Sequence, residues 1–117
     1  MKKKGVVVLG ATGSIGLSTA KVLEQFPDRF EVISLVARNN LDELARQAGL
    51  FKPRTVITTD ERLTETLQSK LPAGVKGEGG WEPVMQAVTA PETDVVVCAI
   101  VGTGGLEPVV ALLLSNI

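Results

Sequence analysis

The glycine-rich segment Gly10–Gly16 (GATGSIG) constrains the fold of this chain more than any other part of its sequence. It follows the run Val6–Leu9, which is apolar without alternation and is therefore typical of a strand buried on both faces of a parallel sheet. Behind the glycines, residues recur with the spacing of one helix face, at Ile15, Thr19, Val22, Leu23 and Phe26. A strand, a glycine-rich turn and a helix in this order predict the first half of a β-α-β unit.

The rest of the chain continues this alternation of strands and helices. We expect strands at Glu31–Val36, Thr55–Thr58 and Asp94–Ile100, with a short one near Val75. Helices are predicted at Leu41–Ala48, with Asn40 and Glu43 as a capping box and Gly49 as C-cap, and at Glu61–Leu71, Glu82–Thr89 and Leu106–Ser115. This order predicts a doubly wound α/β domain with a mostly parallel, Rossmann-like sheet over residues 1–117.

Length, charge and residue types exclude several classes of function. A chain of 117 residues fits one domain but is small for a complete two-substrate enzyme. A net charge of −1 gives no basic face for nucleic acid, and the apolar runs are too short for a signal peptide or a membrane helix. The single Cys98 suits a reducing cytosol, so we expect a cytoplasmic protein. No His or Tyr is present, so no imidazole base or phenol acid lies in the chain, and no metal-ligand spacing is found.

The glycine segment matches a phosphate-binding turn. Ala11, Gly13 and Gly16 take the spacing of G-x-G-x-x-G, in which glycines make the turn, admit the pyrophosphate and let the helix pack closely. The helix N-terminus would supply N–H groups to the anion, and Thr12 and Ser14 would add hydroxyls. No Gly-Lys-Ser/Thr follows, so it is not a P-loop. We expect dinucleotide binding, with a purely structural turn as the alternative.

Two further segments bear on the cofactor. NAD sites place a carboxylate at the end of the second strand, whereas this chain has Arg38 there, suitably placed for the 2′-phosphate of NADPH. Arg38 as a solvated surface residue is the alternative, and Asn40 can act as helix cap, as cofactor contact, or as both. The glycine-rich stretch that begins at Ala99 leaves the last predicted strand, where ligands of doubly wound sheets collect, although it can equally be a simple connection.

These three motifs closely resemble the N-terminal domain of the 1-deoxy-D-xylulose 5-phosphate reductoisomerase family, over essentially the whole chain. The most specific pieces are Gly13–Gly16, Phe30–Ala37 and Ala99–Pro108. The resemblance implies an NADPH-dependent oxidoreductase of the non-mevalonate isoprenoid pathway that uses a divalent metal (Mg, Mn or Co). Such enzymes rearrange a sugar phosphate and reduce the product to 2-C-methyl-D-erythritol 4-phosphate, and the resemblance suggests a homodimer.

The resemblance also assigns roles to residues. Thr12, Gly13, Ser14 and Ile15 would hold the cofactor phosphates, Arg38, Asn39 and Asn40 would surround the 2′-phosphate, and Ala99, Ile100 and Val101 would line the adenosine side. With the flanking positions, the candidate cofactor-binding residues are Gly10, Thr12, Gly13, Ser14, Ile15, Gly16, Ala37, Arg38, Asn39, Asn40, Ala99, Ile100 and Val101.

The family's catalytic, metal-binding and substrate-binding segments would all follow Ile117. We therefore expect this chain to be the N-terminal part of a longer enzyme, which binds NADPH but does not turn over substrate alone. One alternative is the start of a short-chain reductase or epimerase, whose Tyr-x-x-x-Lys pair would also lie beyond Ile117. The other is a non-enzymatic domain that senses NADP(H).

Overall fold

The computed structural model describes residues 3–101 and 108–114. The elements follow one another as β1 (Lys4–Leu9), α1 (Ser14–Gln25), β2 (Phe30–Ala37), α2 (Leu41–Phe51), β3 (Thr55–Thr58), the 3₁₀ turn η1 (Glu61–Leu63), α3 (Thr64–Lys70), β4 (Lys76–Gly79), α4 (Glu82–Thr89), β5 (Val95–Val101) and β6 (Pro108–Leu114). The predicted strands and helices up to β5 are confirmed, most of them within about a residue at each end.

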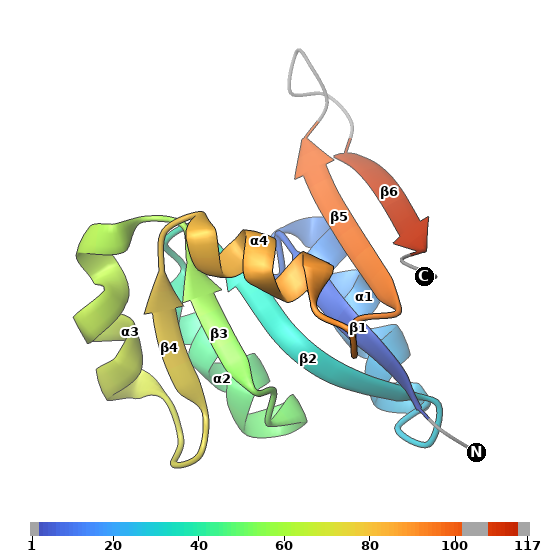
Figure 1. The fold of residues 1–117 in the computed structure, drawn as a ribbon, viewed down its shortest axis with the longest axis horizontal. Helices are drawn as coiled ribbons and strands as arrows, with labels where there is room; N and C mark the ends of the chain where they lie inside the picture. The colour runs from blue at the N-terminus through green and yellow to red at the C-terminus, as the bar shows by residue number, and fades with distance from the viewer. Residues whose placement is uncertain (1–2, 102–107, 115–117) are drawn as a thin grey trace.

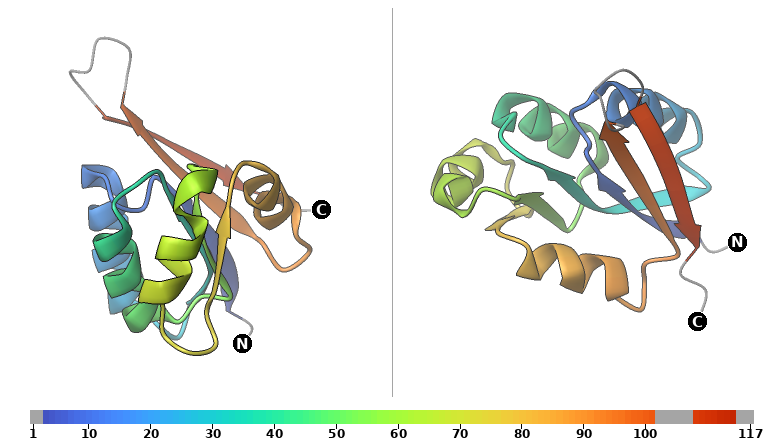
Figure 2. Two further views of the ribbon diagram at one scale, coloured as in Figure 1. Left: turned by 90° about the vertical axis from the view of Figure 1, so that its left-hand side faces the viewer. Right: turned by 90° about the horizontal axis from the view of Figure 1, so that it is seen from above.

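A single sheet with the strand order β4-β3-β2-β1-β5-β6 forms the middle layer, and β1 to β5 run parallel (Figure 1). Helices α1, α2 and α3 cover one face, and α4 lies on the other (Figure 2). The chain moves outward from β1 to β4 and then returns to place β5 on the other side of β1. The carboxyl ends of β1 and β5 therefore form the switch point at which ligands bind in doubly wound sheets.

The helix expected at Leu106–Ser115 is wrong where the structure describes it. Pro108–Leu114 forms β6, an antiparallel partner of β5 that pairs Val101 with Pro108 and Val95 with Leu114. A short continuous apolar run does not distinguish a buried helix from a strand by its period. Here Val109 and Val110 are β-branched, which favours a strand, and Pro108 takes the first position of an edge strand, where it is tolerated.

The sheet is buried on both faces, which explains why its strands read as uninterrupted apolar runs. Val8, Leu35 and Val56 pack with Leu44 of α2 and Leu67 of α3 in one core cluster. The neighbouring residues of the same strands, Val7, Val36 and Ile57, pack with Val84 of α4 in the other. Since successive side chains of a strand point to opposite faces, each of these strands contributes to both cores.

Two local predictions for the helices need correction. The buried face of α1 consists of Gly16, Ala20 and Leu23, whereas the predicted positions Val22 and Phe26 are 51% and 41% exposed. Helix α2 continues past Gly49 to Phe51 and ends at Lys52, which adopts the left-handed conformation with φ of 48°. Gly16 belongs to the buried face because α1 packs directly on the loop that precedes it.

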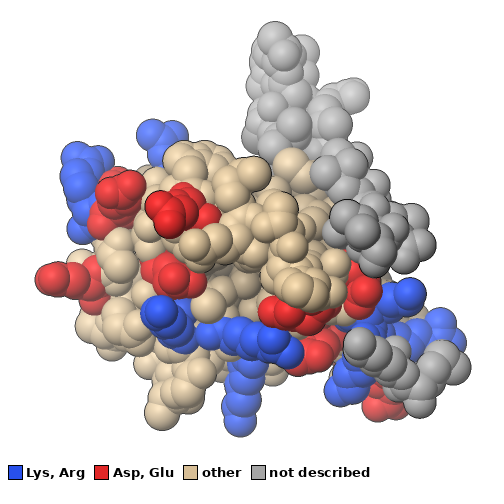
Figure 3. All heavy atoms as spheres, in the orientation of Figure 1, with Lys and Arg blue, Asp and Glu red and all other residues tan. Residues whose placement is uncertain are grey.

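Charged side chains of both signs are interspersed on the face shown in Figure 3, around a largely uncharged centre. This mixture agrees with the net charge of −1. None of the helices in the described part of the chain is long and apolar enough to cross a bilayer.

Candidate functional site

The loop between β1 and α1 is fixed against the end of β2. The backbone N–H groups of Gly10 and Ala11 both donate to the carbonyl oxygen of Val36, each at 2.9 Å. Gly10 has a φ of +80°, a conformation that strongly favours glycine. The loop therefore lies at the carboxyl edge of the sheet, next to the segment that follows β2.

The structure requires glycine at position 16 but not at position 13. A Cβ at Gly16 would lie 2.2 Å from the oxygen of Gly10 and 2.5 Å from the carbonyl carbon of Ala11, so close packing of α1 excludes any side chain. A Cβ at Gly13 would meet nothing nearer than the Gly10 oxygen at 3.7 Å, and its φ of −79° suits any residue. Folding explains Gly16 but not Gly13, whose bare backbone leaves space for a ligand at the helix N-terminus.

The N-terminus of α1 has the chemistry of an anion site. Gly13 is its N-cap and offers no side-chain oxygen to the first turn. The first helical N–H with a backbone acceptor is that of Leu17, which donates to Gly13 at 2.8 Å. The N–H groups of Ser14, Ile15 and Gly16 have no backbone acceptor within the described ranges. Free N–H groups at the positive end of a helix dipole bind phosphate, so this loop fits a pyrophosphate.

The residues after β2 lie at the same edge. Ala37 is buried, whereas Arg38, Asn39 and Asn40 are exposed. Asn40 caps α2 as predicted, because its Oδ1 accepts a hydrogen bond from the backbone N–H of Glu43 at 3.3 Å. The other half of the capping box is not formed, since the Glu43 carboxylate accepts hydrogen bonds from Arg46 and Gln47 instead. The hydrogen bond from Arg46, followed in importance by that from Gln47, lowers the pKa of Glu43.

Gln47 connects α2 to the glycine loop. Its Nε2 donates to the carbonyl oxygen of Ala11 at 2.9 Å and to the carboxylate of Glu43 at 3.0 Å. The side chain is almost fully buried, and its Oε1 has no hydrogen-bond partner among the described residues. The Gln47 amide thus attaches the glycine loop to α2, the helix that Asn40 caps, in addition to the backbone bonds from the loop to Val36. No sequence pattern points to this residue, because the contact joins positions 36 residues apart.

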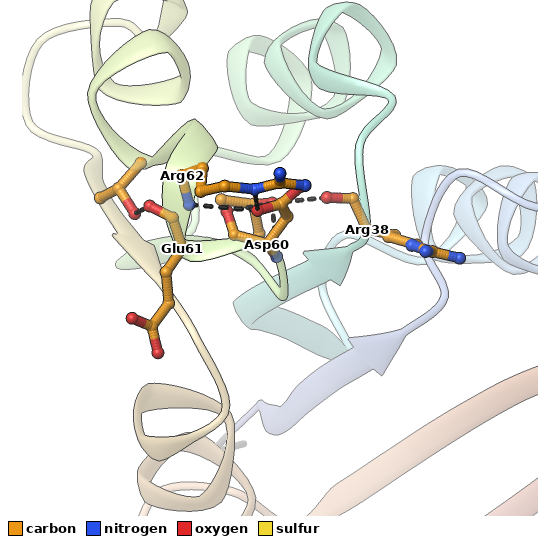
Figure 4. Close-up of polar contacts among 6 residues, drawn as sticks. Arg38, Asp60, Glu61 and Arg62 are labelled. Carbon is orange, nitrogen blue, oxygen red and sulfur yellow. Dashed lines mark hydrogen bonds and ion pairs between the residues drawn. The ribbon is translucent and has the colours of Figure 1, made fainter.

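The end of β3 adds two charged residues that sequence reasoning did not connect with the site. The hydroxyl of Thr58 donates to the carbonyl oxygen of Arg38, and the carboxylate of Asp60 forms an ion pair with Arg62 (Figure 4). The Arg38 side chain extends from the end of β2 away from Asp60. The signal that would have found Asp60 and Arg62 is their position in the turn that follows a parallel strand next to β2.

The third candidate segment is only partly described. β5 pairs with β1 and places the backbone of Ala99, Ile100 and Val101 at its carboxyl end, beyond the residue that faces Leu9. The glycine loop at 102–105 lies outside the described residues. Within residues 3–101 and 108–114, no three residues of the types His, Cys, Asp and Glu are placed to hold a metal ion.

Comparison with known proteins identifies the relatives of the chain. The family model for 1-deoxy-D-xylulose 5-phosphate reductoisomerase matches residues 6–116. The reductoisomerase of Trichlorobacter lovleyi is 43% identical over 116 residues, which is 97% of this chain and 30% of that protein. That of Desulfosudis oleivorans is 42% identical over 113 residues, 92% of this chain and 29% of that protein. The chain thus spans less than a third of the length of these relatives.

Solved structures agree with the sequence comparison. The Zymomonas mobilis reductoisomerase in complex with NADPH superposes with a TM-score of 0.79 and 34% identity, covering 90% of this chain and 28% of that one. A reductoisomerase complex with NADPH, fosmidomycin and magnesium gives a TM-score of 0.77 and 31% identity, over 88% of this chain and 26% of that one. The nearly complete match to the family model and the shared fold lead to one conclusion: the chain belongs to the 1-deoxy-D-xylulose 5-phosphate reductoisomerase family.

Proposed function

We propose that residues 1–117 are the NADPH-binding domain of a longer reductoisomerase. In that enzyme, NADPH supplies the reducing equivalent for conversion of the rearranged sugar phosphate to 2-C-methyl-D-erythritol 4-phosphate. Membership of the family supports this function over a short-chain reductase or a non-enzymatic NADP(H) sensor. The related Zymomonas mobilis enzyme has been solved with NADPH, which supports the choice of cofactor.

The observation that carries the proposal is the open backbone of Gly13 at the N-terminus of α1. Thr12, Gly13, Ser14 and Ile15 bind the pyrophosphate, with Gly10 and Gly16 shaping the loop. Arg38, Asn39 and Asn40 bind the 2′-phosphate beside Ala37, and Ala99, Ile100 and Val101 line the adenosine side. The short distance between the loop and the end of β2, fixed by the bonds to Val36, supports one ligand that spans both segments.

The remaining properties of the whole enzyme are also proposals. The divalent metal and the sugar-phosphate substrate bind to parts of the polypeptide outside residues 1–117. We further propose that the full-length enzyme is a cytoplasmic homodimer. The 117-residue chain binds NADPH without catalysing the reaction, and turnover by a purified sample free of the full-length enzyme would contradict this assignment.

The proposal is tested by calorimetric titration of the chain with NADPH and NADH. We expect NADPH to bind well ahead of NADH. Arg38→Ala should reduce that preference about ten- to hundredfold, since a hydrogen bond to a charged group is worth about 1.5–3 kcal/mol. Arg54→Ala is the matched control, because Arg54 precedes β3 at the opposite edge of the sheet and pairs with Glu92 at 3.0 Å.

If the chain binds neither nucleotide, or both equally well, the assignment of an NADPH site to this domain is wrong. If NADPH is preferred but Arg38→Ala keeps the full preference, the site remains and the role of Arg38 is wrong.

A further inference from the structure

A second arginine lies at the carboxyl edge of the sheet, one strand beyond Arg38. The guanidinium of Arg62 binds both oxygens of Asp60, with Nε to Oδ1 at 3.0 Å and Nη2 to Oδ2 at 2.9 Å. The backbone N–H of Arg62 also donates to Oδ1, at 3.1 Å. The pairing uses two of the five N–H groups of a guanidinium, so three remain for another ligand. The Arg62 side chain is 88% exposed, so these groups are accessible.

The segments that carry Arg38 and Arg62 are tied together. The hydroxyl of Thr58 donates to the carbonyl oxygen of Arg38, and the backbone N–H of Thr59 donates to the oxygen of Ala37 at 3.0 Å. In Figure 4 the guanidinium of Arg62 lies across Asp60 on the side that faces the backbone of Arg38. Arg62 chiefly, and the charge of Arg38 to a smaller extent, lower the pKa of the Asp60 carboxyl. The backbone of Arg38 and the guanidinium of Arg62 therefore lie side by side at this edge, although the exposed Arg38 side chain itself extends away from Asp60.

The charges at this edge favour a phosphate only when Arg62 is included. The charges of Arg38 and Asp60 alone would sum to zero, and the Asp60 carboxylate would repel a phosphate bound by Arg38. Arg62 neutralises Asp60, so Arg38, Asp60 and Arg62 together carry one positive charge with N–H donors on two side chains. The carboxylate of Glu61 points away from this group, toward Gly80. A 2′-phosphate carries about −1.5 to −2 charges near pH 7, and planar guanidinium groups match phosphate oxygens well.

We propose that Arg62 is a second specificity-determining residue, which binds the 2′-phosphate of NADPH together with Arg38 and is positioned by Asp60. This inference rests on the proposed function, because it assigns a further residue to the same cofactor site. It makes the preference for NADPH a property of two adjacent strands, β2 and β3, rather than of the single turn after β2.

The test measures the affinities of the chain for NADPH and NADH by calorimetry, with thermal melting of every variant. Arg62→Ala should weaken NADPH binding about three- to tenfold while the affinity for NADH changes by less than about twofold. The loss should be smaller than for Arg38→Ala, because Asp60 already occupies part of the Arg62 guanidinium. Arg62→Lys keeps the charge without the planar donors and should lie between wild type and Arg62→Ala. Arg54→Ala removes the same charge at the opposite edge and should change neither affinity.

The outcomes separate this inference from the proposed function. If the wild type prefers NADPH and Arg62→Ala keeps the same preference, Arg62 has no role at the 2′-phosphate. A loss that is equal for NADPH and NADH, or that Arg54→Ala reproduces, also overturns the inference, since it would reflect folding or overall charge. If the wild type itself shows no preference for NADPH, the proposed function fails and this inference fails with it.

Discussion

Alanine at Gly13 and alanine at Gly16 should have different consequences, because we assign Gly13 to ligand binding and Gly16 to the packing of α1. At Gly16 a Cβ would lie 2.2–2.5 Å from backbone atoms of Gly10 and Ala11, and backbone cannot turn aside as a flexible side chain does. Overpacking of this kind costs about 1–3 kcal/mol. The helix propensity of alanine offsets up to about 1 kcal/mol of that cost. We expect a net loss of about 1–2 kcal/mol, or roughly 4–10 °C in melting temperature.

At Gly13 the same substitution should hardly affect folding. Losing glycine as N-cap costs about 0.5–1 kcal/mol, whereas restricting the unfolded chain returns about 0.4–1 kcal/mol. The added methyl group lies 3.7 Å from its nearest neighbour in the protein, but it occupies the space where a pyrophosphate would approach the backbone. We therefore expect an almost unchanged melting temperature and at least a tenfold weaker affinity for NADPH, which corresponds to about 1.4 kcal/mol.

Thermal melting by circular dichroism and calorimetric titration with NADPH measure the two effects separately. Gly49→Ala serves as control, since a Cβ there meets nothing within 4 Å and lies inside α2. It should stabilise the chain by about 0.5–1 kcal/mol without changing the affinity. The reasoning is refuted if Gly13→Ala binds NADPH as tightly as the wild type, or if it unfolds as early as Gly16→Ala.

Three further predictions concern the residues around the site and the pH. Asn40→Ala should cost about 1 kcal/mol through loss of the α2 cap, and Asn40→Asp, which keeps a cap oxygen, should restore most of it in a denaturant titration. Gln47→Leu leaves the carbonyl of Ala11 without its donor, at about 1–3 kcal/mol, but removes the unpartnered Oε1, so we expect a net loss of about 1 kcal/mol by the same titration. The lowered pKa of Glu43 means that its contribution to stability is present above the unfolded carboxyl pKa of about 4.3 and is lost as the pH falls through the lower folded value. Between about pH 5 and pH 3 the melting temperature of Glu43→Gln should therefore fall less than that of the wild type. An equal fall in the two proteins would contradict this assignment.

Most of the fold could be predicted because its signals are local. The run Val6–Leu9, the glycines behind it and the similar run at Asp94–Ile100 identify strands buried on both faces without knowledge of their neighbours. What failed depends on packing between distant segments. The buried face of α1 contains Gly16 and Ala20 beside Leu23 because the helix packs against the sheet and, at Gly16, against the loop backbone, whereas hydrophobic spacing alone favoured the larger Val22 and Phe26. The strand β6 likewise depends on a pairing with β5 that no local pattern reveals.

The residues of the candidate site likewise differ in whether a local sequence pattern or tertiary packing identifies them. Gly10–Gly16 and Arg38 are candidates that the sequence itself suggests, since a known spacing along the chain connects such positions to a dinucleotide. Gln47 could not be predicted, because only the packing of α2 against the loop brings its amide to Ala11.

Arg54 and Arg62 show what strand direction adds to the sequence. Both lie close to β3 in the chain, Arg54 directly before it and Arg62 in the turn that follows it, both are exposed, and both form ion pairs with acidic residues. A sequence gives no reason to prefer either as a ligand for phosphate. In a parallel sheet, however, the residue before each strand lies at the amino edge and the residue after it at the carboxyl edge, where the glycine loop and Arg38 also lie. Once β3 is known to pair in parallel with β2, Arg62 becomes a neighbour of the proposed cofactor site and Arg54 its natural control.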